Sequence, residues 1–245
     1  YGIGADGIIL MEGSRKADAK MRMFNADGSE GSMAGNALRC MAKYLYDNGI
    51  VRKEEMTLET DKGTKTVRVY TTDGRVTSAC VDMGYATLDT TALRLNIPKR
   101  QVVNYPVEIA GQPWEITCVD MGNPHCVVFC SRVDGVDVAR IGPQFEHAPY
   151  FPDRINTEFI RVVNPSTIKM RVWERGSGET LACGTGACAV AVACALNGKT
   201  GSQVDVELLG GVLNIRWDRE NDRVYMTGPA VEVYHGEIGL KENNV

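Results

Sequence analysis

Hydrophobic and polar positions alternate along several short stretches of the chain, as they do in β-strands with one buried face. These stretches are rich in β-branched and aromatic residues and are bounded by Gly, Asp and Asn. They cover residues 66–70, 76–83, 117–129, 167–173, 203–209 and 212–217. The pattern predicts a fold in which strands dominate.

Two longer segments depart from this alternation and predict the two principal helices. Residues 36–48 and 185–197 have helical length, and each segment is followed by a glycine that can end a helix. The second segment is apolar on every side, which predicts burial all round. The first has a narrower apolar face, with Arg39 and Lys43 expected to point away from it.

A small-residue turn precedes each predicted helix, and an acidic, glycine-containing loop precedes each turn, so that one unit occurs twice. Many strands with one central helix per half suggest two similar α+β domains, with a boundary near residues 83–98. A site at the junction of the domains would receive the N-termini of both helices.

Composition narrows the class of protein. The chain of 245 residues is 44% hydrophobic and 24% charged, and it has no apolar segment of membrane-spanning length. We therefore expect no membrane association. The 27 basic and 31 acidic residues give a net charge of -4 without a basic run, so nucleic acid is not an expected partner.

The eight cysteines lack the regular spacing of a disulfide scaffold and contain no Cys-x-x-Cys pair. We interpret them as thiols of a cytoplasmic protein and expect no metal. Gly2-Ile-Gly4-Ala-Asp-Gly7 matches the dinucleotide fingerprint, but an apolar strand-like run follows it instead of a helix. A turn before a buried strand is the preferred interpretation, and no nucleotide cofactor is expected.

The most informative stretch runs from Glu174 to Ala187 and places a thiol, Cys183, just before the second predicted helix. Unpaired backbone N–H groups and the helix dipole favour a thiolate there and lower its pKa. The same N–H groups can hold a carboxylate. A simple buried cysteine is an equally good interpretation of this residue taken alone.

The run Cys183-Gly-Thr-Gly-Ala-Cys-Ala189, preceded by Glu174-Arg-Gly-Ser-Gly-Glu-Thr180, closely resembles the diaminopimelate epimerase family. Further matching stretches follow the family's order: Phe24 to Glu30 leading into Gly35 to Arg39, Met121 to His125, and Tyr225 to Ala230. The resemblance extends from Tyr1 to about Gly239.

The resemblance implies that each domain is a mainly antiparallel, strand-rich barrel around a central helix, with the active site at the domain junction. It divides the chain into an N-terminal domain of residues 1–82 plus 229–245, whose first strands precede Tyr1, and a C-terminal domain of residues 83–228. It implies a cytoplasmic enzyme, a homodimer, that interconverts LL- and meso-diaminopimelate without cofactor or metal. The product serves lysine and peptidoglycan precursor synthesis.

Inversion of an α-carbon needs a base on one face and an acid on the other, and two opposed thiols can supply them. By resemblance Cys183 is one of these thiols, and the position of the other is occupied by Ala34. A chain with Ala34 is therefore expected to be impaired in catalysis. His125 and Glu174 are expected to position or tune the thiols.

The resemblance also implies a set of substrate-binding residues. Backbone N–H groups of the two helix N-termini are expected to hold the α-carboxylate, and the Arg175 guanidinium to take the distal carboxylate through two parallel hydrogen bonds. The full set is Asn25, Gly35, Asn36, Asn123, Asn156, Glu174, Arg175, Gly184 and Thr185.

Three other functions remain as alternatives. A proline or hydroxyproline racemase or dehydratase is compatible with Ala34, although a ring imino acid has no distal groups for Asn25 and Arg175. A non-catalytic amino-acid-binding protein is the second alternative. A cysteine hydrolase using Cys183 and His125 is the weakest, because no third group that orients the histidine is evident in the sequence.

Overall fold

The structure, a computed structural model, describes residues 7–25, 27–31 and 34–239. Its first half contains β1 (Gly7–Glu12), β2 (Ala19–Asn25), β3 (Glu30–Gly31), α1 (Gly35–Asp47), β4 (Glu55–Thr60), β5 (Gly63–Thr72) and β6 (Arg75–Gly84). Its second half contains β7 (Tyr105–Ile109), β8 (Gln112–Asp120), β9 (Pro124–Phe129), a short 3₁₀ turn (Val133–Gly135), α2 (Val138–Glu146), β10 (Asn156–Asn164), β11 (Thr167–Glu174), β12 (Gly178–Thr180), α3 (Gly184–Leu196), β13 (Gln203–Leu208), β14 (Gly211–Asp218) and β15 (Arg223–Pro229).

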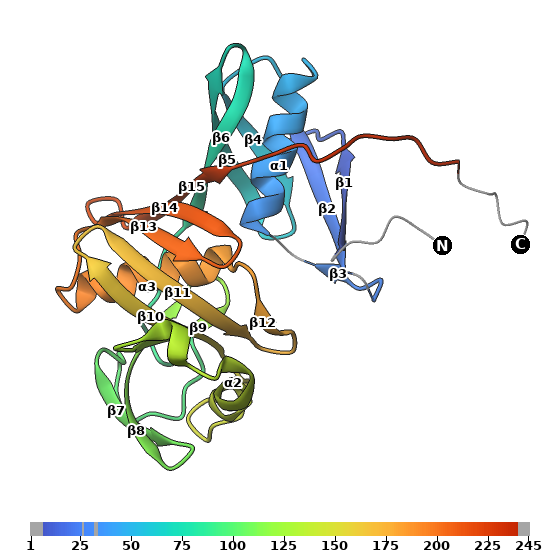
Figure 1. Cartoon of the computed structure of the whole chain (residues 1–245). Coiled ribbons are helices and arrows are strands. Elements are labelled where there is room, and N and C mark those ends of the chain that lie inside the picture. Colours follow the sequence, from blue (N-terminus) through green and yellow to red (C-terminus); the bar gives the residue numbers. More distant parts are fainter. Residues whose placement is uncertain (1–6, 26, 32–33, 240–245) are drawn as a thin grey trace, which may run out of the picture.

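The strands form one continuous sheet in the order β1-β2-β4-β5-β6-β15-β14-β13-β11-β10-β9-β8-β7, and β3 and β12 add to β2 and β11. Most neighbours are antiparallel, and the parallel pairs are β2 with β4, β9 with β10 and β11 with β13. Strand β15 pairs with β6 on one side and with β14 on the other, so it joins the two halves (Figure 1). The strand-rich α+β fold predicted from the sequence is confirmed.

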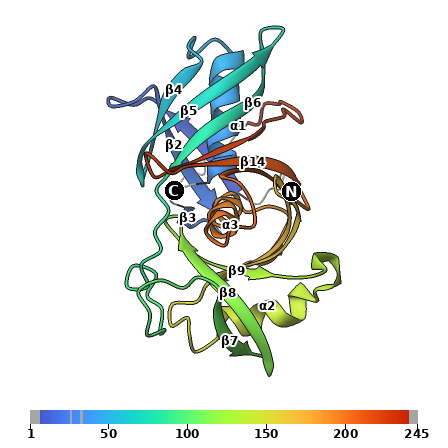
Figure 2. The same ribbon diagram turned by 90° about the vertical axis from the view of Figure 1, so that its left-hand side faces the viewer.

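Helix α3 is the axis of the second half. Figure 2 shows it nearly end-on, with strands curving around it. Residues 186–195 are all buried, and the helix packs on β8, β9, β10, β13, β14 and β15. The all-round burial predicted from the apolar sequence is confirmed, and its small side chains let the strands approach closely.

Helix α1 packs one face against β5, β6 and β15, while Cys40 and Tyr44 on its other side are exposed. Both principal helices begin and end one residue before the predicted bounds. The expectation that Arg39 points away from the core was wrong. Arg39 is buried, and its Nε donates to the Pro229 carbonyl oxygen (3.3 Å), because β15 crosses that side of α1.

Two further features differ from the sequence predictions. The stretch 117–129, predicted as one strand, is the β8–β9 hairpin with a turn at residues 121–123. The short helix α2, which contains Pro143, was not predicted, because a proline usually breaks a helix. Phe145 of α2 packs edge-to-face on Phe159, with ring centroids 5.4 Å apart, in a second hydrophobic core.

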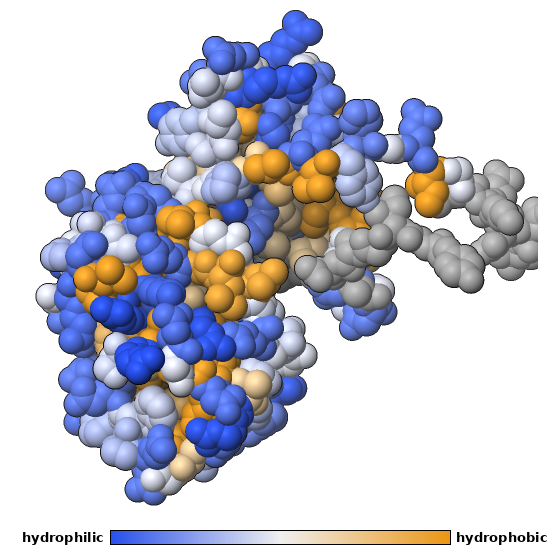
Figure 3. Space-filling model, in the orientation of Figure 1, coloured by the Kyte–Doolittle hydropathy of each residue, from blue (hydrophilic) through white to orange (hydrophobic). Residues whose placement is uncertain are grey.

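The main hydrophobic core contains residues of both α1 and α3, so it extends across the junction of the two halves. In the space-filling view, apolar surface is visible where the two halves meet (Figure 3). The division into residues 1–82 with 229–245 and residues 83–228 stays a prediction. The glycine-containing segment before β1, residues 2–6, lies outside the described residues. A strand, β1, follows it as expected, but the expectation that this strand is buried was wrong, because Ile8, Leu10 and Met11 are exposed at the edge of the sheet.

Candidate active site

The N-termini of α1 and α3 meet at a cleft of about 630 Å³ between the two halves. The cleft is lined on one side by Ala34, Gly35 and Asn36, and on the other by Cys183, Gly184 and Thr185. The structure thus brings together the two predicted catalytic positions and the four residues whose N–H groups were expected to hold a carboxylate.

Ala34 and Cys183 have equivalent places in the fold. Each is the N-cap residue of its helix, with φ −135° and ψ 120° at Ala34 and φ −129° and ψ 111° at Cys183. Met226 of β15 lies between the helix starts: a Cβ added to Gly35 would collide with its Cε, and one added to Gly184 would lie 3.0 Å from its Sδ. The absence of side chains at Gly35 and Gly184 lets the two helix starts approach one shared methionine.

Cys183 is buried, and its Sγ accepts a hydrogen bond from the Gly186 N–H at 3.4 Å. Its Sγ is also 3.5 Å from the Thr185 hydroxyl oxygen. Burial raises the pKa of the Cys183 thiol, and the nearby Glu174 and Glu158 carboxyls raise it further, while Thr185 and Gly186 oppose them. The expected lowering of this pKa by the helix N-terminus is therefore outweighed. In the free protein Cys183 carries its proton, which suits the role of acid.

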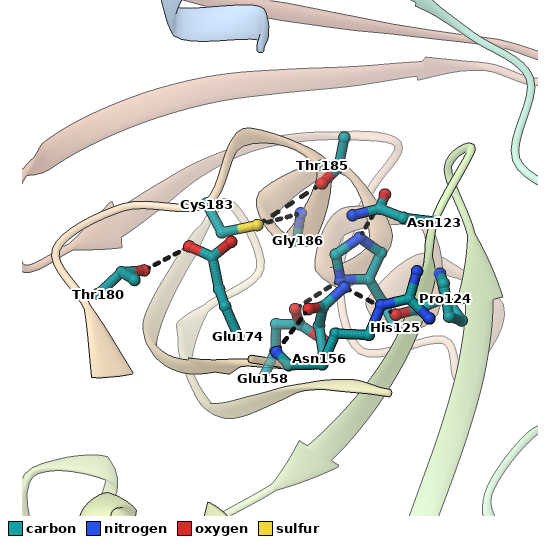
Figure 4. Close-up of polar contacts among 11 residues, drawn as sticks. Asn123, Pro124, His125, Asn156, Glu158, Glu174, Thr180, Cys183, Thr185 and Gly186 are labelled. Atoms are coloured by element: carbon teal, nitrogen blue, oxygen red, sulfur yellow. Dashed lines mark hydrogen bonds and ion pairs between the residues drawn. The ribbon is translucent and has the colours of Figure 1, made fainter. Parts of the chain in front are cut away.

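His125 is fully buried beneath the cleft, where it belongs to a chain of hydrogen bonds (Figure 4). Its Nδ1 is 2.6 Å from Glu158 Oε1, and its Nε2 is 3.0 Å from Asn123 Oδ1. The parallel pairing of β9 and β10 places Asn156 opposite His125 and Glu158 two residues further along the same face. Asn123 lines the cleft, so the chain of contacts runs from the cleft wall to the interior.

Glu174, at the end of β11, lines the cleft and accepts a hydrogen bond from the Thr180 hydroxyl of β12 (Figure 4). Asn156 is buried behind it. Its Oδ1 accepts from the Arg175 backbone N–H (3.0 Å) and its Nδ2 donates to the Pro124 carbonyl (3.0 Å). Asn156 thereby ties the β11–β12 turn to the start of β9.

Asn25 and Arg175 lie outside the residues that line the cleft. The exposed Asn25 side chain donates from Nδ2 to the Ser29 hydroxyl (3.0 Å). The exposed Arg175 side chain donates from Nη1 to the Asp153 carbonyl (3.0 Å). Their roles in substrate binding stay predictions.

Sequence reasoning missed several polar residues of the site. Glu158 is the one charged residue among the buried residues 156–160 of β10, and that charge within a strand-like stretch was the signal available for it. Lys65 and Arg223 line the cleft from strands far apart in the sequence, so no local pattern relates them. Burial lowers the pKa of Lys65, and Arg223 pairs with Asp82 at 2.8 Å.

Among the described residues, one group has the composition and spacing of metal ligands. The ligand atoms of His125, Glu158 and Cys183 lie within 4.8 Å of one another. Both ring nitrogens of His125 already contact protein groups, so these residues fit a network of hydrogen bonds and shared protons.

Comparison with known proteins decides the family. The family model for diaminopimelate epimerase matches residues 1–88 and 117–233. The diaminopimelate epimerase of Desulfovibrio desulfuricans is 53% identical over 243 residues, which cover 97% of this chain and 85% of that protein. That of Acetivibrio thermocellus is 50% identical over 242 residues, covering 99% and 86%.

The chain belongs to the diaminopimelate epimerase family. The resemblance found in the sequence motifs is thereby confirmed, together with the assignment to the epimerases and thus to the isomerases.

Solved structures share the fold at low sequence identity. A probable proline racemase from Agrobacterium radiobacter superposes with a TM-score of 0.70 at 15% identity, covering 97% of this chain and 77% of that chain. A PhzF-family phenazine biosynthesis protein from Bacillus anthracis gives 0.68 at 16% identity, covering 97% and 86%. At these identities the likeness supports the fold alone, so it does not favour the proline racemase alternative.

The reason given against a cysteine hydrolase was wrong, because Glu158 does orient His125. The geometry still argues against that activity. With the side-chain amide oxygen Oδ1 of Asn123 facing it, Nε2 carries a hydrogen, and Nδ1 is engaged by Glu158. No ring nitrogen of His125 is left to accept the proton of Cys183.

Proposed function

We propose that this chain binds diaminopimelate between the starts of α1 and α3, and that the site inverts the α-carbon by proton transfer when both N-cap positions carry thiols. The observation that carries the proposal is the equivalence of Ala34 and Cys183, which are N-cap residues of nearly identical backbone conformation on a shared cleft. Groups so placed can act on opposite faces of one carbon.

The chemistry at the α-carbon follows from these positions. A base at position 34 removes the proton, and the electron pair left on the carbon delocalises into the α-carboxylate. The Cys183 thiol then donates its proton to the other face. The N–H groups of Gly35, Asn36, Gly184 and Thr185 stabilise the charge on the carboxylate. The reverse reaction exchanges the roles of the two positions.

Ala34 interrupts this cycle, because a methyl group neither accepts nor donates a proton. The backbone N–H groups at both helix starts remain, so binding is expected to survive while inversion is lost. A non-catalytic binding protein, one of the alternatives, would likewise bind the substrate without inverting it. Restoring the thiol at position 34 distinguishes that alternative from an epimerase.

We assign binding of the rest of the substrate, beyond its α-carboxylate, to side chains around the cleft. Asn123 and Glu174 line it, and Asn156 holds the β11–β12 turn that carries Arg175. We propose that closure of the two halves brings Asn25 and the Arg175 guanidinium onto the distal end of the substrate and excludes water. His125 and Glu174 support proton transfer from beside the thiols.

Localisation and assembly are proposals of the same kind. The eight cysteines are free thiols, which supports a cytoplasmic enzyme. None of the helices in the described part of the chain is long and apolar enough to cross a membrane. We propose a homodimer, supported by the exposed apolar residues Val231, Val233 and Tyr234 after β15. Sedimentation of the pure protein tests this assembly.

Binding calorimetry tests the substrate. The protein as it stands should bind LL- or meso-diaminopimelate and leave proline unbound, because proline lacks the distal amino-acid group. Arg175→Lys should weaken binding, since an ammonium does not reproduce two parallel guanidinium contacts; Arg140→Lys, an exposed residue on α2, is the matched control. Proline binding, or equal affinities in Arg175→Lys and the parent, contradicts the assignment.

A further inference from the structure

The buried carboxyl of Glu158 contacts His125 and raises the pKa of Cys183, but the proposed reaction gives it no role, and its surroundings are unusual. It is fully buried on β10, and its Oε2 has no hydrogen-bond partner among the described residues. Its Oε1 lies 2.6 Å from His125 Nδ1. A buried carboxyl with one short bond and one free oxygen is costly to keep in a core without a function.

Backbone packing brings this carboxyl up to the start of α3. A Cβ added to Gly186 would lie 2.6 Å from Glu158 Oε1 and 3.2 Å from Cys183 Sγ. The Gly186 N–H donates to the same sulfur. Glycine at this position therefore leaves the space in which Glu158, His125 and Cys183 approach within 4.8 Å of one another.

The hydrogen bonds of His125 determine how many protons the His125–Glu158 pair holds. Because Nε2 donates to Asn123 Oδ1, the Nδ1···Oε1 contact needs one further proton, which either the ring or the carboxyl carries. Neutral imidazole with a carboxylic acid and imidazolium with a carboxylate have the same net charge. A proton can therefore cross the 2.6 Å bond without any exchange with water.

We propose that Glu158 is a positioning residue of this epimerase: it shares one proton with His125 and thereby holds the imidazole against Asn123 at the wall of the cleft. The proposal rests on the proposed function, in which His125 supports proton transfer. A fully buried imidazole can take up positive charge there because the Glu158 carboxylate is its counterion. Glu158 itself is fully buried and is assigned no substrate contact.

Other titratable groups surround Glu158 and His125 and affect their pKa values. Glu174 of β11 and Cys183 at the start of α3 approach it from the cleft side, and Cys126 of β9 approaches it from the core, with Cys118 of β8 behind. Burial raises the pKa of the Glu158 carboxyl, and Glu174 adds to this, while His125 opposes it. Burial and Cys118 likewise raise the pKa of Cys126, so the Cys126 thiol stays protonated near neutral pH.

Nitrogen-15 NMR of the histidine rings tests the shared proton directly, since the chain has only three histidines and His147 and His235 are largely exposed. In the parent protein His125 should show a strongly deshielded exchangeable proton at Nδ1. In Glu158→Gln the ring hydrogen stays at Nε2, facing Asn123 Oδ1, and the new amide NH₂ donates to the lone pair of Nδ1, so that signal should vanish and the ring should be neutral. The matched control is Glu146→Gln, a buried carboxyl on α2 bonded to Trp173, which should leave the His125 signals unchanged.

Turnover supplies a second readout, in chains that also carry Ala34→Cys. Glu158→Gln should lower kcat by about tenfold or more with KM unchanged, because it alters a supporting group for proton transfer and no substrate contact. Glu146→Gln should leave kcat unchanged; because Glu146 accepts from the Gly176 N–H in the turn that carries Arg175, KM is not part of this control. The proposal is overturned if His125 has the same ring signals in Glu158→Gln as in the parent, or if kcat is equal in the two. If Ala34→Cys alone restores no activity, the proposed function fails, and the NMR signals still decide the proton sharing.

Discussion

At the scale of single residues, the burial of Cys183 affects its pKa more than its position at a helix N-terminus does. The sequence placed Cys183 at a helix N-terminus and correctly predicted that it caps α3, and this suggested a lowered pKa. Its exposure and its carboxyl neighbours depend on segments distant in sequence, and they reverse the sign of the shift. Glu158 escaped the sequence analysis for the same reason, because its partner His125 is on another strand.

The buried thiols also predict how stability depends on pH. Burial raises the pKa of Cys194 from 9.0 to about 12. A group whose pKa is raised in the folded state stabilises it below the unfolded pKa, and this contribution is lost as the pH rises through the folded value. Between pH 9.0 and about 12, this thiol should lower the free energy of unfolding by about 1.4 kcal/mol per pH unit.

Urea unfolding at several pH values measures this effect. Cys194→Ala should reduce the loss of stability between pH 9 and pH 10.5, whereas Cys40→Ala, at an exposed position on α1, should leave it unchanged. Equal slopes in the parent and in Cys194→Ala would show that the buried thiol is not the group responsible.

At the scale of elements, the periodicity of the sequence predicted α1 and α3 to within one residue. The alternating stretches correspond to β5, β6, β8, β9, β11, β13 and β14, and the run after Gly7 to β1, whereas the other strands, β10 and β15 among them, were not predicted. It failed at α2, where Pro143 lies inside a short helix, and at the β8–β9 turn, where Gly122 and Asn123 interrupt the stretch that was predicted as one strand. At α2 tertiary packing overrides a local signal, whereas Gly122-Asn123 is itself a local turn signal that the sequence analysis overlooked. The pairing of β6 with β15 joins residues 140 to 151 positions apart, from Gly84 with Val224 to Ser78 with Pro229, and alternation alone does not specify a partner.

Helix α3 should tolerate little increase in side-chain volume, because strands enclose it. Ala189 is fully buried at its centre, and Ala189→Leu should destabilise the protein by about 1–3 kcal/mol through overpacking. Cys40→Leu on the exposed face of α1 is the control and should change stability by less than about 0.5 kcal/mol. A comparable effect of the two substitutions on the urea midpoint would mean that α3 is not the packed axis described.

At the scale of the whole molecule, the sheet and the main core both continue across the junction of the halves. Strand β15 is shared, and Met226 on it lies against the starts of both helices. The sequence predicted two similar units with a site between them. It did not indicate how tightly they are joined, because the shared core consists of residues from widely separated segments.

This continuity predicts a single unfolding transition. All three tryptophans, Trp114, Trp173 and Trp217, belong to the second half, whereas far-ultraviolet circular dichroism reports on both halves. Midpoints from the two probes should coincide. A separate transition seen only by circular dichroism would show that the first half unfolds independently.

The central claim, that Ala34 and Cys183 are the two faces of one epimerisation site, is tested most directly by Ala34→Cys. The measurement follows the stereochemistry of diaminopimelate and its deuterium content at the α-carbon in D₂O. We predict that the parent protein leaves LL-diaminopimelate without inversion, and that Ala34→Cys converts it to the meso isomer with deuterium at the inverted carbon. Inversion by the parent at a comparable rate, or none by a folded Ala34→Cys protein that binds the substrate, would contradict the two-thiol account.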